Sequence, residues 1–139
     1  MTTAARLRHF IGGEWQSSES DAWIPDVNPS DAEDIVGEVP AGTVDDVRRA
    51  VTAAEDAVPV WRGMSGPARA DALYKWGEAI ASRGEALAQL VAREVGKPIG
   101  EARGEVGRCV TILRYYAGEA VRATGRTCRA RPLRRLLRR

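Results

Sequence analysis

Four helical segments with apolar stripes follow one another from residue 43 to about residue 123, and no strand is predicted between them. This order restricts the fold more than any other feature of the sequence. A parallel sheet needs strands that alternate with helices, so a complete doubly wound domain is excluded. The chain is therefore predicted to be either a small α+β domain or the opening section of a larger one.

Short β-favouring runs precede these helices and are separated by turn-forming residues. Gly12 and Gly13 can take the positive φ angles of a two-residue turn, which predicts a hairpin over residues 9–15. Further strands are expected at 23–27 and 35–39, where prolines and short length are typical of sheet edges. The expected fold class is thus α+β, with short N-terminal antiparallel strands followed by about four amphipathic helices.

Capping residues and prolines mark the ends of the predicted helices. Thr43, with Asp46 three residues later, has the form of a capping box, and Pro59 is expected to bound this first helix. Pro67 suits the first turn of the second helix, and Gly96 suits the position just after the third. The sequence therefore predicts separate helices and not one long helix.

The fourth helix is predicted from about Pro98 to Ala123 and contains Gly100, Gly104 and Gly107. Each glycine inside a helix costs up to about 1 kcal/mol relative to alanine, so three of them need a reason. We interpret them as the place where another helix or strand packs closely, in preference to a ligand site.

Groups suited to catalysis or metal binding are few. The two cysteines, Cys109 and Cys128, and the single histidine, His9, make neither a disulfide framework nor a metal-ligand cluster. Cys109 falls on the apolar stripe of the fourth helix and is predicted to be buried and inert. Lys97 is predicted to be a solvated residue of a turn, because no phosphate-binding loop precedes it. The residue pattern by itself predicts no catalytic, cofactor-binding or metal-binding residue.

Charge is distributed unevenly along the chain. Residues 1–125 contain fourteen basic and nineteen acidic side chains, whereas the last fourteen residues contain seven arginines and no acid. Since no aromatic residue lies among these arginines, binding to nucleic acid or a membrane surface would be weak, and neither partner is predicted. We find no apolar stretch with the length of a membrane span or a signal peptide, so a cytoplasmic protein is expected.

Seven short motifs occur in order along the chain and together are more specific than any one of them. They are residues 10–15 (FIGGEW), 27–30 (VNPS), 35–40 (IVGEVP), 61–62 (WR), 94–98 (EVGKP), 101–106 (EARGEV) and 114–118 (RYYAG). The series resembles the N-terminal region of NAD(P)-dependent aldehyde dehydrogenases over about residues 9–127.

The resemblance implies an α/β fold for the whole enzyme, a small aldehyde as substrate, and NAD or NADP as cofactor. In this family a cysteine thiolate adds to the aldehyde, hydride passes to the nicotinamide, and a glutamate-activated water releases the carboxylic acid. The family's catalytic cysteine, general-base glutamate, cofactor glycine motif and oligomerisation strands are expected beyond the end of this chain. The chain alone is therefore expected to be inactive, to bind no cofactor, and to expose apolar stripes that lower its stability.

Arg108 is the residue for which the resemblance suggests a site. Its helix resembles the one whose first turns flank the substrate entrance, where Arg108 would meet an acidic substrate. The plainer alternative, which we favour, is a surface ion pair with Glu101 or Glu105. Glu119 and Arg122 are expected to form a pair of the same kind.

Three segments are predicted along the chain: a flexible N-terminus over 1–8, the family-like part of a cofactor-binding domain over 9–127, and an arginine-rich tail over 128–139 outside the family pattern. The abrupt change in composition at the tail favours a truncated or frameshifted reading frame. Two alternatives to an enzyme fragment remain open. One is a small helical interaction module that binds a full-length relative or another protein, and the other, ranked far behind, is a nucleic-acid binder with a basic tail.

Overall fold

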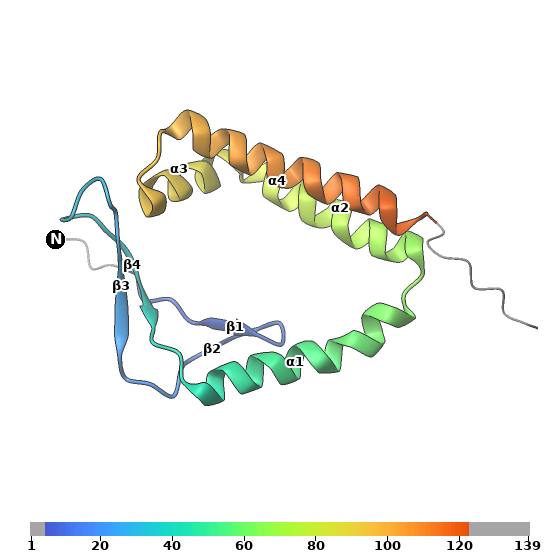
Figure 1. Ribbon diagram of the computed structural model, residues 1–139, viewed down its shortest axis with the longest axis horizontal. Helices are drawn as coiled ribbons and strands as arrows, with labels where there is room; N and C mark the ends of the chain where they lie inside the picture. The colour runs from blue at the N-terminus through green and yellow to red at the C-terminus, as the bar shows by residue number, and fades with distance from the viewer. Residues whose placement is uncertain (1–4, 123–139) are drawn as a thin grey trace, which may run out of the picture.

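The computed structural model describes residues 5–122, which form two strand pairs followed by four helices (Figure 1). The elements are β1 (His9–Ile11), β2 (Glu14–Gln16), β3 (Trp23–Val27), β4 (Ile35–Pro40), α1 (Val44–Gly63), α2 (Gly66–Ser82), α3 (Gly84–Val95) and α4 (Ile99–Ala120). This arrangement confirms the α+β class expected for this chain. The arginine-rich tail, Cys128 included, and the first four residues lie outside the described residues.

Both strand pairs are antiparallel, as predicted. In the first, Phe10 lies opposite Trp15, and Gly12 and Gly13 make the turn with φ angles of 62° and 85°. The second pair joins β3 to β4, with a register irregularity next to Asp26. The glycines explain the tight first turn, because a side chain is strained at positive φ.

Residues 5–7, which belong to the N-terminus that we predicted to be flexible, make defined contacts with β4. The amide of Leu7 donates to the carbonyl of Glu38 at 2.9 Å, and the amide of Glu38 donates to the carbonyl of Ala5 at 3.0 Å. Arg6 also pairs with the Glu38 carboxylate at 2.8 Å and lies over the ring of Trp23. Residues 5–7 are therefore held along β4, because an edge strand offers unpaired backbone groups to a neighbouring segment.

Helix α1 begins as predicted but does not end as predicted. Thr43 caps it: the Thr43 hydroxyl accepts from the Asp46 amide, and the Asp46 carboxylate accepts from the Thr43 amide. Pro59 was expected to bound the helix, yet α1 continues through it to Gly63. Pro59 lacks an amide donor and crowds the preceding turn, yet helical hydrogen bonding resumes beyond it: the carbonyl of Val60 accepts from the amide of the cap residue Met64.

The remaining helix ends agree with the sequence. Ser65 caps α2 by accepting from the Ala68 amide, with Pro67 in the first turn. A break at Arg83 separates α2 from α3, and α3 ends at Gly96, which takes φ 70°. Helix α4 begins at Ile99 and ends at Ala120, three residues before the predicted end at about Ala123.

Helices α2, α3 and α4 pack together and contain the hydrophobic core of the described residues (Figure 1). The core is made mostly of alanine: Ala70, Ala88, Ala102, Val110, Leu113 and Ala117. Small side chains let the helix backbones approach closely. A Cβ atom at Gly66 would collide with the backbone carbonyl of Ala120, so glycine is required where α2 begins beside the end of α4.

Large apolar side chains remain exposed on every helix, as the resemblance led us to expect. They include Val44, Val47, Val51 and Val58 on α1, Trp76 on α2, Leu90 on α3, and Ile112, Tyr115 and Tyr116 on α4. Among the helices of residues 5–122, none combines the length and the hydropathy that a membrane span requires.

Candidate functional site

The outward face of α4 carries Arg108, the residue that the sequence associates with a substrate entrance. Helical periodicity places Gly104, Arg108 and Tyr115 opposite the buried stripe that contains Ala102 and Leu113. Arg108 is exposed on this face. The chain thus presents a guanidinium group on a helix side that no described element covers.

The surface ion pair that we favoured for Arg108 is absent from the structure. Within residues 5–122, no carboxylate lies within 4.0 Å of the Arg108 guanidinium. The Glu105 carboxylate instead pairs with the Lys97 ammonium at 2.6 Å. Lys97 is therefore largely covered, which corrects the prediction that it is solvated. The expected pair of Glu119 with Arg122 is present at 3.1 Å. The positive charge of Arg108 therefore remains available to an anion.

The glycines of α4 for which we predicted close packing are not packed. A Cβ atom at Gly100, Gly104 or Gly107 would meet nothing within 4 Å in the described part of the chain. The physical reason is their position on the helix: they lie on the side opposite Ala102 and Leu113, so the α2–α4 packing never reaches them. A helical projection of the sequence would have shown that these glycines lie away from the apolar stripe of α4.

Cys109 is exposed, which corrects the prediction that it is buried. It lies at the edge of the buried stripe of α4, where α2 and α3 leave it uncovered. The single histidine, His9, cannot serve as the basic partner of a Cys109 thiolate. It lies on β1, beside α1 and away from the α2–α4 bundle (Figure 1). Among the described residues no cluster of three His, Cys, Asp or Glu side chains is placed to hold a metal.

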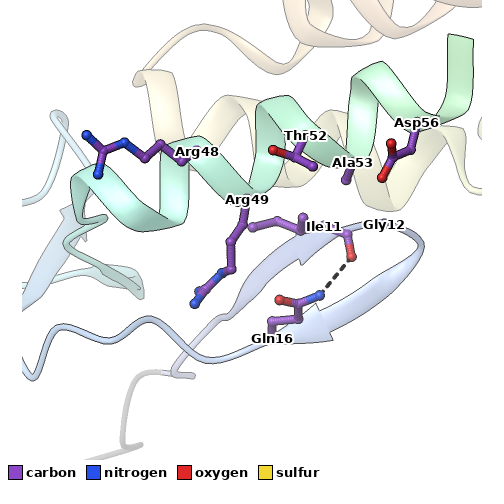
Figure 2. A pocket seen from close by; sticks show the side chains of 8 residues that line it. All are labelled: Ile11, Gly12, Gln16, Arg48, Arg49, Thr52, Ala53 and Asp56. Carbon is purple, nitrogen blue, oxygen red and sulfur yellow. Dashed lines mark hydrogen bonds between the residues drawn. The ribbon is translucent and has the colours of Figure 1, made fainter.

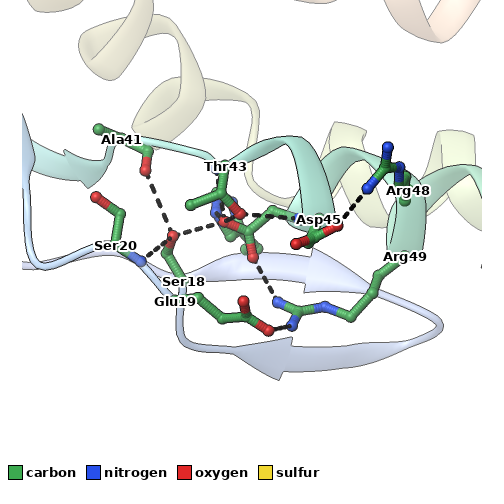
Figure 3. A network of polar contacts seen from close by, with 10 residues as sticks. Ser18, Glu19, Ser20, Ala41, Thr43, Asp45, Arg48 and Arg49 are labelled. Atoms are coloured by element: carbon green, nitrogen blue, oxygen red, sulfur yellow. Dashed lines mark hydrogen bonds and ion pairs between the residues drawn. The ribbon is translucent and has the colours of Figure 1, made fainter.

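Asp46 is the buried charged side chain of the described residues and is the centre of a polar network at the start of α1 (Figure 3). Its carboxylate accepts from the Ser18 hydroxyl at 2.6 Å, from the Thr43 amide at 2.8 Å, and from Arg49. Hydrogen bonds from Ser18 and Thr43 hold the pKa of Asp46 well below its usual range. His9 Nε2 lies 3.7 Å from the same carboxylate. The network joins the segment after β2 to α1.

A shallow hollow of about 370 Å³ lies between α1 and the β1–β2 hairpin (Figure 2). Arg48 and Arg49 line it, so it was a candidate for anion binding. Both guanidinium groups are already paired, however: Arg48 with Asp45 at 2.8 Å, and Arg49 with Asp46 and with Glu19 at 2.8 Å. The hollow therefore has no uncompensated positive charge with which to hold an anion.

A second polar contact, which the sequence analysis missed, ties the loop between β3 and β4 to the end of α3. The Asp34 carboxylate accepts from Arg93 Nε at 3.0 Å and from Nη2 at 2.5 Å, and Arg93 with Asn28 lowers the pKa of Asp34 to about 2. Ser30 Oγ donates to the carbonyl of Gly96 at 3.2 Å. Two of the seven motifs, 27–30 and 94–98, thus meet in space.

Known proteins resemble this chain in sequence and in fold. The sequence model of the aldehyde dehydrogenase family matches residues 15–138, which include most of the tail that we placed outside the family pattern. Alpha-ketoglutaric semialdehyde dehydrogenase of Bacillus subtilis is 47% identical over 117 residues, 84% of this chain and 24% of that protein. Glutarate-semialdehyde dehydrogenase of Pseudomonas putida is 34% identical over 122 residues, 88% of this chain and 25% of that protein.

Solved structures give the same result. An NAD-dependent aldehyde dehydrogenase from Sinorhizobium meliloti matches with a TM-score of 0.80 and 38% identity, over 85% of this chain and 24% of that one. Lactaldehyde dehydrogenase from Escherichia coli matches with a TM-score of 0.85 and 31% identity, over 93% of this chain and 27% of that one. The chain spans about a quarter of the length of the relatives that it matches.

Proposed function

The chain belongs to the aldehyde dehydrogenase family, and from this premise we propose that it forms the N-terminal part of an enzyme that oxidises a carboxylate-bearing aldehyde to the acid with NAD or NADP. The two relatives named above are semialdehyde dehydrogenases. A semialdehyde of this kind carries an anionic carboxylate at the end opposite the reacting carbonyl. A guanidinium group near the entrance suits this substrate class, because it can bind the distal carboxylate.

The exposed Arg108 is the observation that carries this proposal. It projects from α4 without a described acidic partner, whereas the other arginines of the same helix are paired: Arg103 with Glu85 at 2.8 Å and Arg114 with Glu78 at 2.9 Å. A guanidinium binds a carboxylate through two parallel hydrogen bonds, which suits it to orient the distal end of the substrate. We therefore assign Arg108 to the substrate entrance of the assembled enzyme.

The described residues do not fit a dinucleotide cofactor. Such a site needs a glycine-rich turn between a parallel strand and a helix, whereas the strand pairs of residues 5–122 are antiparallel and the left-handed glycines are Gly12, Gly13 and Gly96. Cofactor binding and the oxidation step are accordingly proposed for the remaining three quarters of the enzyme. The chain by itself is expected to form no NADH or NADPH.

A chimeric enzyme tests the proposal. The 117-residue matched segment of the Bacillus subtilis relative is replaced by the corresponding segment of this chain, and formation of NADH or NADPH is followed at 340 nm with semialdehydes and with uncharged aldehydes of equal length. The chimera is expected to retain at least about a tenth of the parent kcat/KM on a semialdehyde, a barrier increase of no more than about 1.4 kcal/mol. A folded chimera without turnover would refute the proposal.

The role of Arg108 is tested in the same chimera. Arg108→Gln is expected to lower kcat/KM about tenfold on the semialdehyde, again about 1.4 kcal/mol, and to leave uncharged aldehydes unchanged. Arg103→Gln removes an arginine from another side of α4 and is the matched control, since its exposed pair with Glu85 contributes little. An equal loss on both substrate classes would exclude carboxylate recognition by Arg108.

We also propose a cytoplasmic location. A reducing compartment suits a chain whose two cysteines form no disulfide framework, and Cys109 is free in the structure. Fractionation of cells with an antibody against the chain tests this, and recovery from a secreted or membrane fraction would contradict it.

A further inference from the structure

Helix α1 has two apolar sides, and neither is buried within the described residues. Its alanine side faces the β1–β2 hairpin across a shallow hollow, where Ala53 is half-buried and Ala50 and Ala57 are exposed. The second side is the α1 valine face, formed by Val44, Val47, Val51 and Val58 at helical spacing, each at least 40% exposed. The only buried residue of α1 is Asp46. The valine face therefore has no partner among the described residues.

Helix α4 shows the same condition on its outward side. The α4 glycine face consists of Gly100, Gly104 and Gly107, at which a Cβ atom would meet nothing within 4 Å in residues 5–122. Tyr115 lies on the same side of the helix as Gly104 as an exposed aromatic side chain. Glycines lower the stability of an isolated helix, yet they leave its backbone open to close approach by another element.

The comparison structures show how much of a larger fold this chain represents. The chain reproduces the arrangement of about a quarter of the Sinorhizobium meliloti and Escherichia coli enzymes, with TM-scores of 0.80 and 0.85. In those proteins the same arrangement is continuous with three further quarters of the chain. Extended apolar surfaces on a small protein mark contact sites, and two such faces on one quarter of a larger fold point to the rest of that fold.

Resting on the proposed function, we propose that the α1 valine face and the α4 glycine face form a docking surface for the complementary three quarters of an aldehyde dehydrogenase chain, which can be supplied as a separate polypeptide. A full-length relative already carries its own copy of this quarter in contact with the remainder. The surfaces that this chain would contact are then occupied. The preferred partner is accordingly an aldehyde dehydrogenase that lacks the matched segment.

The experiment uses the complete 139-residue chain and the Bacillus subtilis relative with its 117-residue matched segment deleted. The two are coexpressed so that the chain is present while the partner folds, and the complex is measured by size-exclusion chromatography with light scattering. We expect the deleted partner to become soluble in an equimolar complex. The intact relative, used as the control, is expected not to bind.

Substitutions on the α1 valine face test where the partner docks. Val51→Asp places a charge on that face and is expected to weaken the complex at least tenfold. Thr52→Asp adds the same charge at the next, exposed position, about 100° around the helix, and is expected to change the affinity less than twofold. Circular dichroism of each variant alone checks that both retain the helical content of the parent chain.

A substitution on the α4 glycine face gives an independent test. Gly104→Leu meets nothing within 4 Å in the described residues, so the isolated chain is expected to keep or raise its melting temperature. The same side chain is expected to abolish the complex, because the partner approaches the backbone there. Unchanged binding by Gly104→Leu would remove the glycine face from the proposal.

Four results would overturn the proposal: a partner that stays insoluble with the chain as without it, equal binding of the deleted and intact relatives, equal effects of Val51→Asp and Thr52→Asp, or self-association of the chain in place of a complex. The outcome is separable from that of the proposed function. An active chimera without a complex in trans would refute docking alone, whereas a complex with an inactive chimera would refute the enzymatic proposal alone.

Discussion

The bundle of helices α2, α3 and α4 differs from the unit of α1 and the β1–β2 hairpin in how many apolar side chains it buries. Helix α4 buries four apolar residues against its neighbours, whereas α1 buries only the polar Asp46. The helices of the bundle bury their apolar side chains against one another, and glycines and tyrosines of α4 remain exposed. The α1 unit is held by capping and hydrogen bonds around Asp46 and leaves valines outside. The contrast teaches that one part has its core within the chain and the other requires a surface from elsewhere.

The largest effect is expected from removing core volume in the bundle. Leu113→Ala should destabilise the chain by about 2–4 kcal/mol, because Leu113 is buried between α4 and α2 and the cavity would be only partly filled. Val51→Ala on α1 is the matched control and should change the free energy of unfolding by less than about 0.5 kcal/mol. Urea unfolding followed by circular dichroism measures both. Equal losses would show that α1 is packed in solution as tightly as α4.

Removing the N-terminal cap of α1 should lower the stability by an intermediate amount. Thr43→Ala removes the hydroxyl that accepts from the Asp46 amide and is expected to cost about 1 kcal/mol. Because α1 is held mainly by this network, the loss should appear as faster amide hydrogen exchange in α1 with the bundle unaffected. Equal acceleration in α2–α4 would mean that the two parts unfold as a single unit.

A smaller effect of opposite sign is expected on the outer side of the bundle. Gly104→Ala should stabilise the isolated chain by up to about 1 kcal/mol, since alanine favours the helix and its Cβ meets nothing within 4 Å in the described residues. Gly66→Ala is the contrasting variant, because its Cβ would collide with the Ala120 carbonyl, and it should destabilise. Thermal melts report both, and stabilisation by Gly66→Ala would contradict the close approach of α2 and α4.

The smallest effect is a pH dependence of the contact between the β3–β4 loop and α3. The pKa of Asp34 falls to about 2 in the folded chain because Arg93 and Asn28 donate hydrogen bonds to it. A lowered folded pKa stabilises above the unfolded value of about 4, and this contribution is lost as the pH falls from about 4 towards about 2. Asp34→Asn should therefore flatten the decline in stability over that range. Melting temperatures measured between pH 5 and pH 2 check this, and parallel curves would assign the decline to other carboxylates.

Local chemistry made the strands, turns and helix ends predictable. Gly12 and Gly13 determine a tight turn, Thr43 with Asp46 determines a capped helix start, and Gly96 takes the left-handed conformation that ends a helix. The in-order motifs identified the family by resemblance. Pro59 shows the limit of such local reasoning, since a proline near the end of a helix weakens it without stopping it.

Long-range contacts were not predictable from local patterns. Arg93 with Asp34 and Ser18 with Asp46 join parts of the chain that are far apart in sequence, and Lys97 with Glu105 joins the turn before α4 to that helix. Helical spacing predicted neighbours three or four residues away, such as Glu101 or Glu105 for Arg108. The alternative partner of Glu105 becomes visible only when the turn before α4 brings Lys97 back to the helix.

The sequence by itself thus determined the order and type of the elements, the capping chemistry and the family, because these depend on residues close together in the chain. Tertiary structure alone decided which apolar faces are covered. It left the valines of α1, the glycines of α4 and Arg108 facing outward, since burial depends on whether a second surface exists to meet a face. Amphipathic periodicity shows that a face is apolar, and only packing shows whether the same chain supplies its partner.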